Sequence, residues 1–237
     1  MSLDNIFLPG LDEQCKFLRG NLTSAVQNAL VIGSASELCA LFISELYSCP
    51  VELVVGDYES LLNSKINLGD NEAVKISLMD FEITDFEDSS FDLIYAQASI
   101  SSLNRNKIIR ELKRILRPGG YLCVGEIVSL KNDIPQFVKD IFDSSDLLPT
   151  FIGDFEKYYI DRNFEVIARY DLSKTLQDYY SKSASLLKNA KGNLDDKEKS
   201  YYKKLLNKIS HESNAYLKLG GDKYIGFTAA LLKKGEN

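Results

Sequence analysis

The fold is decided by the stretch Ser89-Ser90-Phe91-Asp92-Leu93-Ile94-Tyr95 together with a later run, Leu116-Arg117-Pro118-Gly119-Gly120-Tyr121-Leu122. Between the two, apolar residues recur at the spacing of one helix face, at Ile108, Ile109, Leu112, Ile115 and Leu116. The sequence Pro118-Gly119-Gly120 predicts the end of that helix, and the apolar residues after it predict a strand. This strand-helix-strand unit is the building block of a parallel sheet.

The same alternation continues on both sides of this unit. Apolar runs predict strands at 29–32, 51–55, 73–77, 91–95, 121–126, 164–170 and 224–231, with helices at 15–19, 38–46, 60–64, 107–116, 134–142 and 155–161. From 173 to 219, two amphipathic patterns predict a helical hairpin, divided at Gly192-Asn193 and ended by Gly220-Gly221. We therefore expect an α/β protein with a doubly wound, mostly parallel, seven-stranded sheet.

Composition excludes several classes of partner. The chain has 237 residues, 45% of them hydrophobic, which is enough for one core; we expect a single domain, 1–237, elaborated by the hairpin at 173–221. A net charge of -6 argues against nucleic acid, and the lack of a long apolar run argues against a membrane span, so we expect a cytoplasmic protein. Four scattered cysteines and the single His211 predict no metal site.

A family resemblance rests on the motifs just quoted. Asp80, the segment 86–92 and the run 116–122 look like the middle of class I S-adenosylmethionine (SAM)-dependent methyltransferases. Segments 8–12, 178–180 and 224–227 resemble a small-molecule branch of that superfamily, the methyltransferase type 11-like branch. The resemblance implies a Rossmann-like sheet with an antiparallel last strand, a helical lid over the substrate, SAM as cofactor, S-adenosyl-L-homocysteine (SAH) as product, a small-molecule acceptor and no metal.

The loop after the first strand departs from the family pattern. An acidic residue and a Gly-x-Gly-x-Gly loop are expected there, but the sequence from Val31 to Glu37 reads VIGSASE. Gly33 is kept, with Ser34 after it, whereas Ala35 and Glu37 stand at the second and third glycine positions. Glu37 has two interpretations: a carboxylate in the first turn of a helix, or a substitute for the missing acid that meets the amino group of the cofactor.

The ends of the next three strands supply the other expected cofactor contacts. Asp57, followed by Tyr58, stands where a carboxylate accepts from both ribose hydroxyls; the alternative is an N-cap. Asp80-Phe81 resembles the pair that reads adenine; the alternative is a plain loop Asp. Ala96 and Gln97 lie where the family backbone passes the methionine end, unless Gln97 makes only structural hydrogen bonds.

The acceptor site is less defined by sequence. Glu126, at the end of a strand, is a candidate base or substrate ligand, or else a cap of the next loop. Aromatic residues of the hairpin either line an acceptor pocket or pack as core, namely Tyr179, Tyr180, Tyr202 and Tyr216. No catalytic residue is assigned, because positioning supplies most of the rate of a methyl transfer.

Three functions remain open. The leading hypothesis is a SAM-dependent methyltransferase that acts on a small molecule. The alternative is a methyltransferase-fold binding or scaffold protein that has lost SAM binding, which Val31, Ala35 and Glu37 favour. A nicotinamide-dependent dehydrogenase fits poorly, since the Gly-x-Gly-x-x-Gly motif is absent. The acceptor and the oligomeric state are not determined by the sequence.

Overall fold

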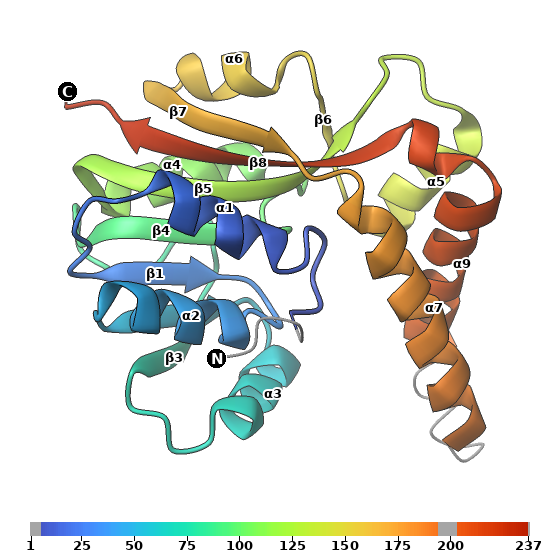
Figure 1. The fold of residues 1–237 in the computed structure, drawn as a ribbon, viewed down its shortest axis with the longest axis horizontal. Helices are drawn as coiled ribbons and strands as arrows, with labels where there is room; N and C mark the ends of the chain where they lie inside the picture. Colours follow the sequence, from blue (N-terminus) through green and yellow to red (C-terminus); the bar gives the residue numbers. More distant parts are fainter. Residues whose placement is uncertain (1–5, 194–202, 237) are drawn as a thin grey trace.

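One mixed sheet organises the protein. The computed structural model describes residues 6–193 and 203–236, whose strands run in the order β3-β2-β1-β4-β5-β8-β7, with a short β6 paired to β5 (Figure 1). The strands are β1 (Ala29–Ile32), β2 (Val51–Val55), β3 (Val74–Leu78), β4 (Phe91–Gln97), β5 (Leu116–Ser129), β6 (Thr150–Phe151), β7 (Phe164–Asp171) and β8 (Ile225–Lys234). Pairing is parallel from β3 to β6, whereas β8 is antiparallel to both β5 and β7. The expected fold class, including the antiparallel last strand, is confirmed.

Helices cover both faces of the sheet. The described helices are α1 (Glu13–Asn21), α2 (Glu37–Tyr47), α3 (Tyr58–Leu68), α4 (Arg105–Ile115), α5 (Gln136–Ser144), α6 (Phe155–Ile160), α7 (Thr175–Asn193), α9 (Lys203–Lys218) and the 3-10 turn η1 (Gly221–Lys223). Alternate residues of β1 enter two separate cores: Val31 packs with α1 and α2, and Leu30 with α4 and α6. This alternation is what a strand buried on both faces requires.

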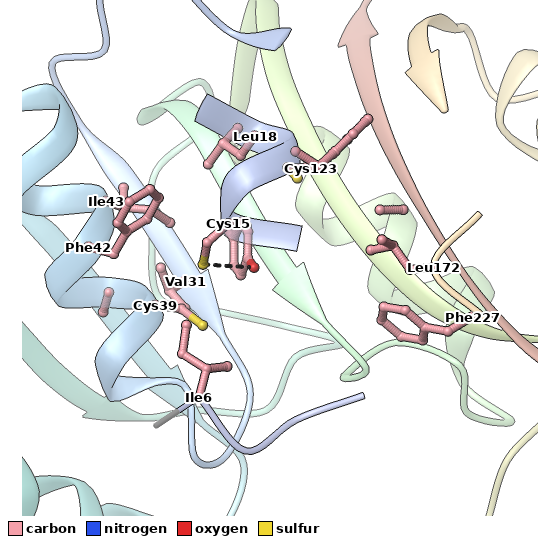
Figure 2. Packing of buried hydrophobic residues seen from close by; sticks show 14 of the residues in the cluster. Ile6, Cys15, Leu18, Val31, Cys39, Phe42, Ile43, Cys123, Leu172 and Phe227 are labelled. Carbon is pink, nitrogen blue, oxygen red and sulfur yellow. Dashed lines mark hydrogen bonds between the residues drawn. The ribbon is translucent and has the colours of Figure 1, made fainter. Parts of the chain in front are cut away.

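Cysteines from three different elements pack in the hydrophobic core on the α1 side of the sheet. Figure 2 shows Cys15 of α1 and Cys39 of α2 beside Val31, with Cys123 of β5 and Phe227 of β8 further along the sheet. All four cysteines are free and buried, as expected of thiols that act as small core groups. Within the described residues, no group of His, Cys, Asp and Glu side chains could hold a metal ion.

The expected element boundaries needed four corrections. α3 is longer than the predicted 60–64, and β6 was not predicted because two residues carry no periodicity. α4 ends at Ile115 and β5 begins at Leu116, so Pro118-Gly119-Gly120 lies within β5 instead of ending the helix. α7 continues through Gly192-Asn193, because one glycine in a helix costs only about 1 kcal/mol. Gly220, at φ 81°, follows the end of α9 as predicted.

The hairpin of α7 and α9 stands beyond the edge where the parallel strands end (Figure 1). Its base belongs to the main core through Leu176, Tyr180 and Tyr216, which are all buried. Tyr202 lies outside the described residues, as do the side chains of much of the hairpin tip. Among the described helices, none is long and apolar enough to cross a membrane.

Candidate cofactor and acceptor site

A cavity opens where the parallel strands β2, β3 and β4 end. Its volume is about 660 Å³. It is lined by residues that follow these strands and by the first turns of α3 and α4: Gly56, Asp57, Tyr58, Leu78, Met79, Asp80, Phe81, Glu82, Ser102, Asn104 and Ile108. In open parallel sheets, ligands bind at this edge, next to the strand where the connections change direction. Four of the expected cofactor residues, Asp57, Tyr58, Asp80 and Phe81, are therefore brought together around one cavity.

Asp57 is the N-cap of α3, and its carboxylate can still accept hydrogen bonds from a ligand. Its Oδ1 accepts the backbone N–H of Ser60 at 2.8 Å, and its Oδ2 accepts the Ser60 hydroxyl at 2.7 Å. Hydrogen bonds from the hydroxyl and the N–H of Ser60 hold the pKa of Asp57 below its ordinary value, so the carboxylate is ionised at neutral pH. Asp57 is thus an N-cap, and a carboxylate with about four lone-pair sites still accepts further bonds.

Asp80 and Phe81, which follow β3, form another part of the cavity wall. Asp80 Oδ1 accepts the backbone N–H of Glu82 at 2.8 Å, which fixes a tight turn after β3. The Phe81 ring packs over Gly56, 3.6 Å from the place of a Cβ at that glycine, so the two strand ends approach closely. An exposed carboxylate beside an aromatic ring suits a heteroaromatic base that donates a hydrogen bond.

Helix α4 holds the loop that carries Asp80 and Phe81. Glu111 accepts the backbone N–H of Thr84 at 2.8 Å and its hydroxyl at 2.6 Å. Arg114 donates to the carbonyl of Phe86 at 2.8 Å and pairs with both Glu111 and Asp88. The segment 80–88 is therefore fixed by charged side chains whose role was not evident from the sequence.

The loop after β1 is shaped by two left-handed residues. Gly33 has φ 125°, and a Cβ there would lie 2.8 Å from the Cβ of Ser99. Ala35 has φ 59°, a conformation that favours glycine, so the backbone keeps the glycine-type path although the side chain has changed. Ser34 is exposed and its hydroxyl lies 2.7 Å from that of Ser60, which links this loop to the Asp57 cap.

Glu37 takes a partner that neither interpretation anticipated. It is the first residue of α2, and its buried carboxylate accepts a hydrogen bond from the hydroxyl of Ser64 on α3. A buried carboxylate needs such a partner, and the helix dipole favours its position. Glu37 is not among the residues that line the cavity.

Gln97 is buried and fully used by the protein itself. Its exposed fraction is 1%, and its amide nitrogen donates to the carbonyls of Pro9 and Leu11, both at 2.8 Å. Its amide oxygen accepts from the hydroxyl of Tyr95 at 2.6 Å. Ala96, before it, is buried within the sheet. The structure therefore has the structural alternative for Gln97, because both its amide nitrogen and its amide oxygen are hydrogen-bonded to other residues of the protein.

Glu126 is also buried and hydrogen-bonded to other residues of the protein. Its carboxylate forms an ion pair with Arg105 at 2.8 Å and accepts from the hydroxyls of Tyr159 at 2.5 Å and Ser101 at 3.2 Å. The guanidinium of Arg105 also stacks 3.7 Å from the ring centre of Tyr158. A carboxylate this well paired and only 1% exposed is a structural group, so its expected role as base or substrate ligand does not fit this geometry.

The hairpin tyrosines are packed against one another. Tyr180 stacks on Tyr216 with ring centres 4.5 Å apart, and Tyr179 contacts Phe7 at 5.3 Å. Burial raises the pKa of Tyr179 and of Tyr216 to about 12, so both hydroxyls are protonated at neutral pH. Tyr180 and Tyr216 are core residues, whereas Tyr179 is half-buried at the hairpin's inner end. His211, on α9, is exposed.

The sheet order and the loops at the strand ends define the fold class of the chain. An eight-stranded sheet with an antiparallel β8, a loop with glycine-type backbone after β1, and carboxylates after β2 and β3 are the features of the class I SAM-dependent methyltransferase fold. The chain has this fold. Residues 32–124 match the family model described as "Methyltransferase domain"; the match runs from the last residue of β1 to the middle of β5.

Curated relatives carry methyltransferase names. The chain is 36% identical over 63 residues to a sterol 4-C-methyltransferase of Caenorhabditis elegans, covering 26% of this chain and 19% of that protein. It is 32% identical over 136 residues to a ubiquinone/menaquinone biosynthesis C-methyltransferase of Pseudoalteromonas translucida, covering 53% of each. A sarcosine/dimethylglycine N-methyltransferase of Halorhodospira halochloris is 26% identical over 204 residues, covering 83% of this chain and 71% of that protein. The matches thus span about half or less of the first two relatives.

Solved structures agree on the fold. Phosphoethanolamine N-methyltransferase 2 of Haemonchus contortus, solved with SAH, superposes with a TM-score of 0.77 at 13% identity, covering 98% of this chain and 55% of that one. The 4+2 cyclase SpnF superposes with a TM-score of 0.74 at 16% identity, covering 96% and 82%. At such identities the likeness concerns the fold alone, and the second example carries a name other than methyltransferase.

Proposed function

We propose that the chain is a SAM-dependent methyltransferase that acts on a small-molecule acceptor. The observation that carries the proposal is the cavity of about 660 Å³ with Asp57 and Asp80 on its walls. Two acceptor carboxylates beside the Phe81 ring fit a ligand with a ribose diol and an adenine amine. The match of residues 32–124 to a methyltransferase domain supports the same ligand.

Each wall of the cavity has a separate task in this proposal. Asp57 accepts from the ribose hydroxyls, since an ionised carboxylate accepts without donating. Asp80 accepts from the adenine amine, and Phe81 packs on the ring. The bound cofactor supplies an electrophilic methyl group, and the residues of this chain orient the reactants and exclude water. Ser34 and Ala35, on the loop beside Asp57, would line the path of the methionine part.

The names of the relatives, two aromatic side chains and the net charge suggest which acceptors to test. The names of the relatives reported above refer to a sterol, to ubiquinone and menaquinone biosynthesis, and to sarcosine or dimethylglycine. The half-buried Tyr179 and Phe7 would form the near wall of an acceptor site beneath the hairpin 173–221, as part of one domain. The net charge of -6 disfavours nucleic acid as acceptor.

The test is transfer of a radiolabelled methyl group from SAM to a panel of acceptors. The panel contains sarcosine and dimethylglycine, quinols, sterols, a bulk protein and a bulk RNA. Label found in one of the small-molecule classes supports the proposal. Label found only in protein or RNA contradicts the acceptor class, and the double variant Asp57→Asn/Asp80→Asn serves as the control for transfer that does not involve this site.

The alternative function is favoured by one observation. The Glu37 carboxylate, which could have replaced the acid missing at Val31, instead accepts a hydrogen bond from Ser64 and does not line the cavity. A protein that kept the fold but not the cofactor would have such a site. It would bind neither SAM nor SAH at millimolar concentration and would transfer no label.

A further inference from the structure

One side chain holds the N-terminal segment against the sheet edge where the candidate site lies. This segment, residues 6–11, is called the N-terminal strap and crosses that edge before α1 begins (Figure 1). The amide nitrogen of Gln97, the last residue of β4, donates to the carbonyls of Pro9 and Leu11 at 2.8 Å each. The two N–H bonds of one amide thus bind two carbonyls of the strap.

The backbone of the strap makes a tight turn at the residues that bind Gln97. Gly10 and Leu11 have φ 89° and 46°, and Leu11 N–H donates to Leu8 O at 2.8 Å, which makes a tight turn. The N–H of Glu13 then donates to Gly10 O at 3.1 Å. A Cβ at Gly10 would lie 2.4 Å from the Phe227 ring, so the turn sits directly on β8.

The other end of the Gln97 amide fixes its orientation. The amide oxygen accepts from the Tyr95 hydroxyl at 2.6 Å and from the Cys39 thiol at 3.5 Å. A reversed amide would place its oxygen against two carbonyls that cannot donate. With Gln97 1% exposed, a lost bond would leave a buried polar group without a partner.

The strap connects the two parts of the candidate site. Gln97 follows Ala96, which pairs with Ile32 directly before the Gly33 loop. At the other end of the strap, the Phe7 ring lies 5.3 Å from the Tyr179 ring on α7. The strap therefore touches both the end of β4, beside the cofactor loop, and the inner end of the hairpin.

We propose that Gln97 is a positioning residue that holds the strap beside the cofactor loop after β1 and couples cofactor retention to the hairpin. It acts through the strap and does not touch the cofactor. This inference rests on the proposed function, and it predicts that loss of the Gln97 donor weakens cofactor binding without any change to Asp57 or Asp80.

The test compares Gln97→Glu with the wild-type protein by hydrogen exchange and by SAH titration. The variant keeps the shape but replaces the donor by oxygen. Exchange at the Leu11 and Glu13 amides should rise, SAH affinity should fall about tenfold, and SAH should protect these two amides in the wild type only. Gln177→Glu, the same change at an exposed position of α7, should leave all three unchanged.

Each outcome separates the inference from the proposed function. Faster exchange confined to the strap supports a positioning role, whereas faster exchange across β1 and β4 as well indicates general destabilisation and overturns it. Equal SAH affinity in wild type and variant also overturns it and leaves the proposed function intact. No SAH binding by the wild type overturns the proposed function itself.

A second variant covers the case in which Gln97→Glu does not fold. Gly10→Ala alters the strap turn from the opposite side, through its contact with Phe227, and should give the same exchange pattern and the same loss of affinity. If neither variant folds, protection of the Leu11 and Glu13 amides by SAH in the wild type decides: protection supports a strap held beside the cofactor loop, and its absence overturns the inference.

Discussion

At the scale of single residues, two aspartates that line the same cavity have different structural roles. Asp57 serves both as the N-cap of α3 and as a wall of the cavity, whereas Asp80 closes a turn with Glu82 and faces the same space. A substitution of Asp57 therefore changes stability as well as ligand binding, unless the cap is kept.

Asparagine separates the two roles of Asp57. Because Asn caps a helix about as well as Asp, Asp57→Asn should leave the free energy of unfolding nearly unchanged. It should weaken SAH binding at least about tenfold, or about 1.4 kcal/mol, since the amide presents a donor where the ribose diol needs an acceptor. Asp80→Asn should weaken SAH binding to a similar extent.

The matched control is Asp85→Asn, an exposed aspartate of the same loop that does not line the cavity. Isothermal titration of all three variants with SAH checks the prediction, alongside urea unfolding. Wild-type affinity in Asp57→Asn and Asp80→Asn would remove both residues from the cofactor site.

At the scale of elements, the loops after the strands are set by backbone geometry and by their neighbours. Gly33 combines φ 125° with a close approach to Ser99, so Gly33→Ala should destabilise the protein by about 1 to 3 kcal/mol and lower its Tm by several degrees. Gly20→Ala is the control, because Gly20 lies in α1 and a Cβ added there would meet no other side chain or segment within 4 Å. It should be neutral or stabilising by up to about 1 kcal/mol. Equal Tm values for both variants in a thermal melt would contradict the account of the loop.

Acid should loosen the loop after β3 through Glu111. Burial alone would raise the pKa of Glu111, but hydrogen bonds from Arg114 and Thr84 outweigh it and lower the pKa from 4.5 to about 2. A lowered folded-state pKa means that the stabilisation, on the order of 3 kcal/mol, is complete above about pH 5 and is lost as the pH falls towards 2.

The comparison of wild type with Glu111→Gln measures this effect. Urea unfolding should show the variant less stable at neutral pH, with a difference that shrinks as the pH falls from about 5 to 2. A difference that stays constant over this range would mean that the Glu111 carboxylate does not stabilise the loop through its charge.

Much of the element structure could be predicted from the sequence because it depends on local patterns. The spacing of apolar residues predicts the buried strands β1 and β2 and the amphipathic helix α4. The two-residue β6 does not, and the bond between Gln97 and Pro9 joins residues that no periodicity relates. For the same reason the sequence could place Asp57 and Asp80 at strand ends but could not show that Glu37 and Glu126 face Ser64 and Arg105.

At the scale of the whole molecule, sheet, strap and hairpin meet at one edge. The cavity lies at that edge, the strap is held there by Gln97, and the hairpin base is part of the same core through Leu176 and Tyr180. Fold alone does not decide the reaction, since the superposed structures include a protein named as a cyclase as well as methyltransferases. The proposed function therefore depends on whether the chain binds SAM and SAH.

Isothermal titration of the wild-type protein with SAM and, separately, with SAH tests that claim most directly. The account predicts saturable heat with one site per chain and a Kd in the micromolar range, about -8 kcal/mol, for both ligands. No heat and no shift in Tm at millimolar ligand would contradict it, and the chain would then be a methyltransferase fold that works without the cofactor.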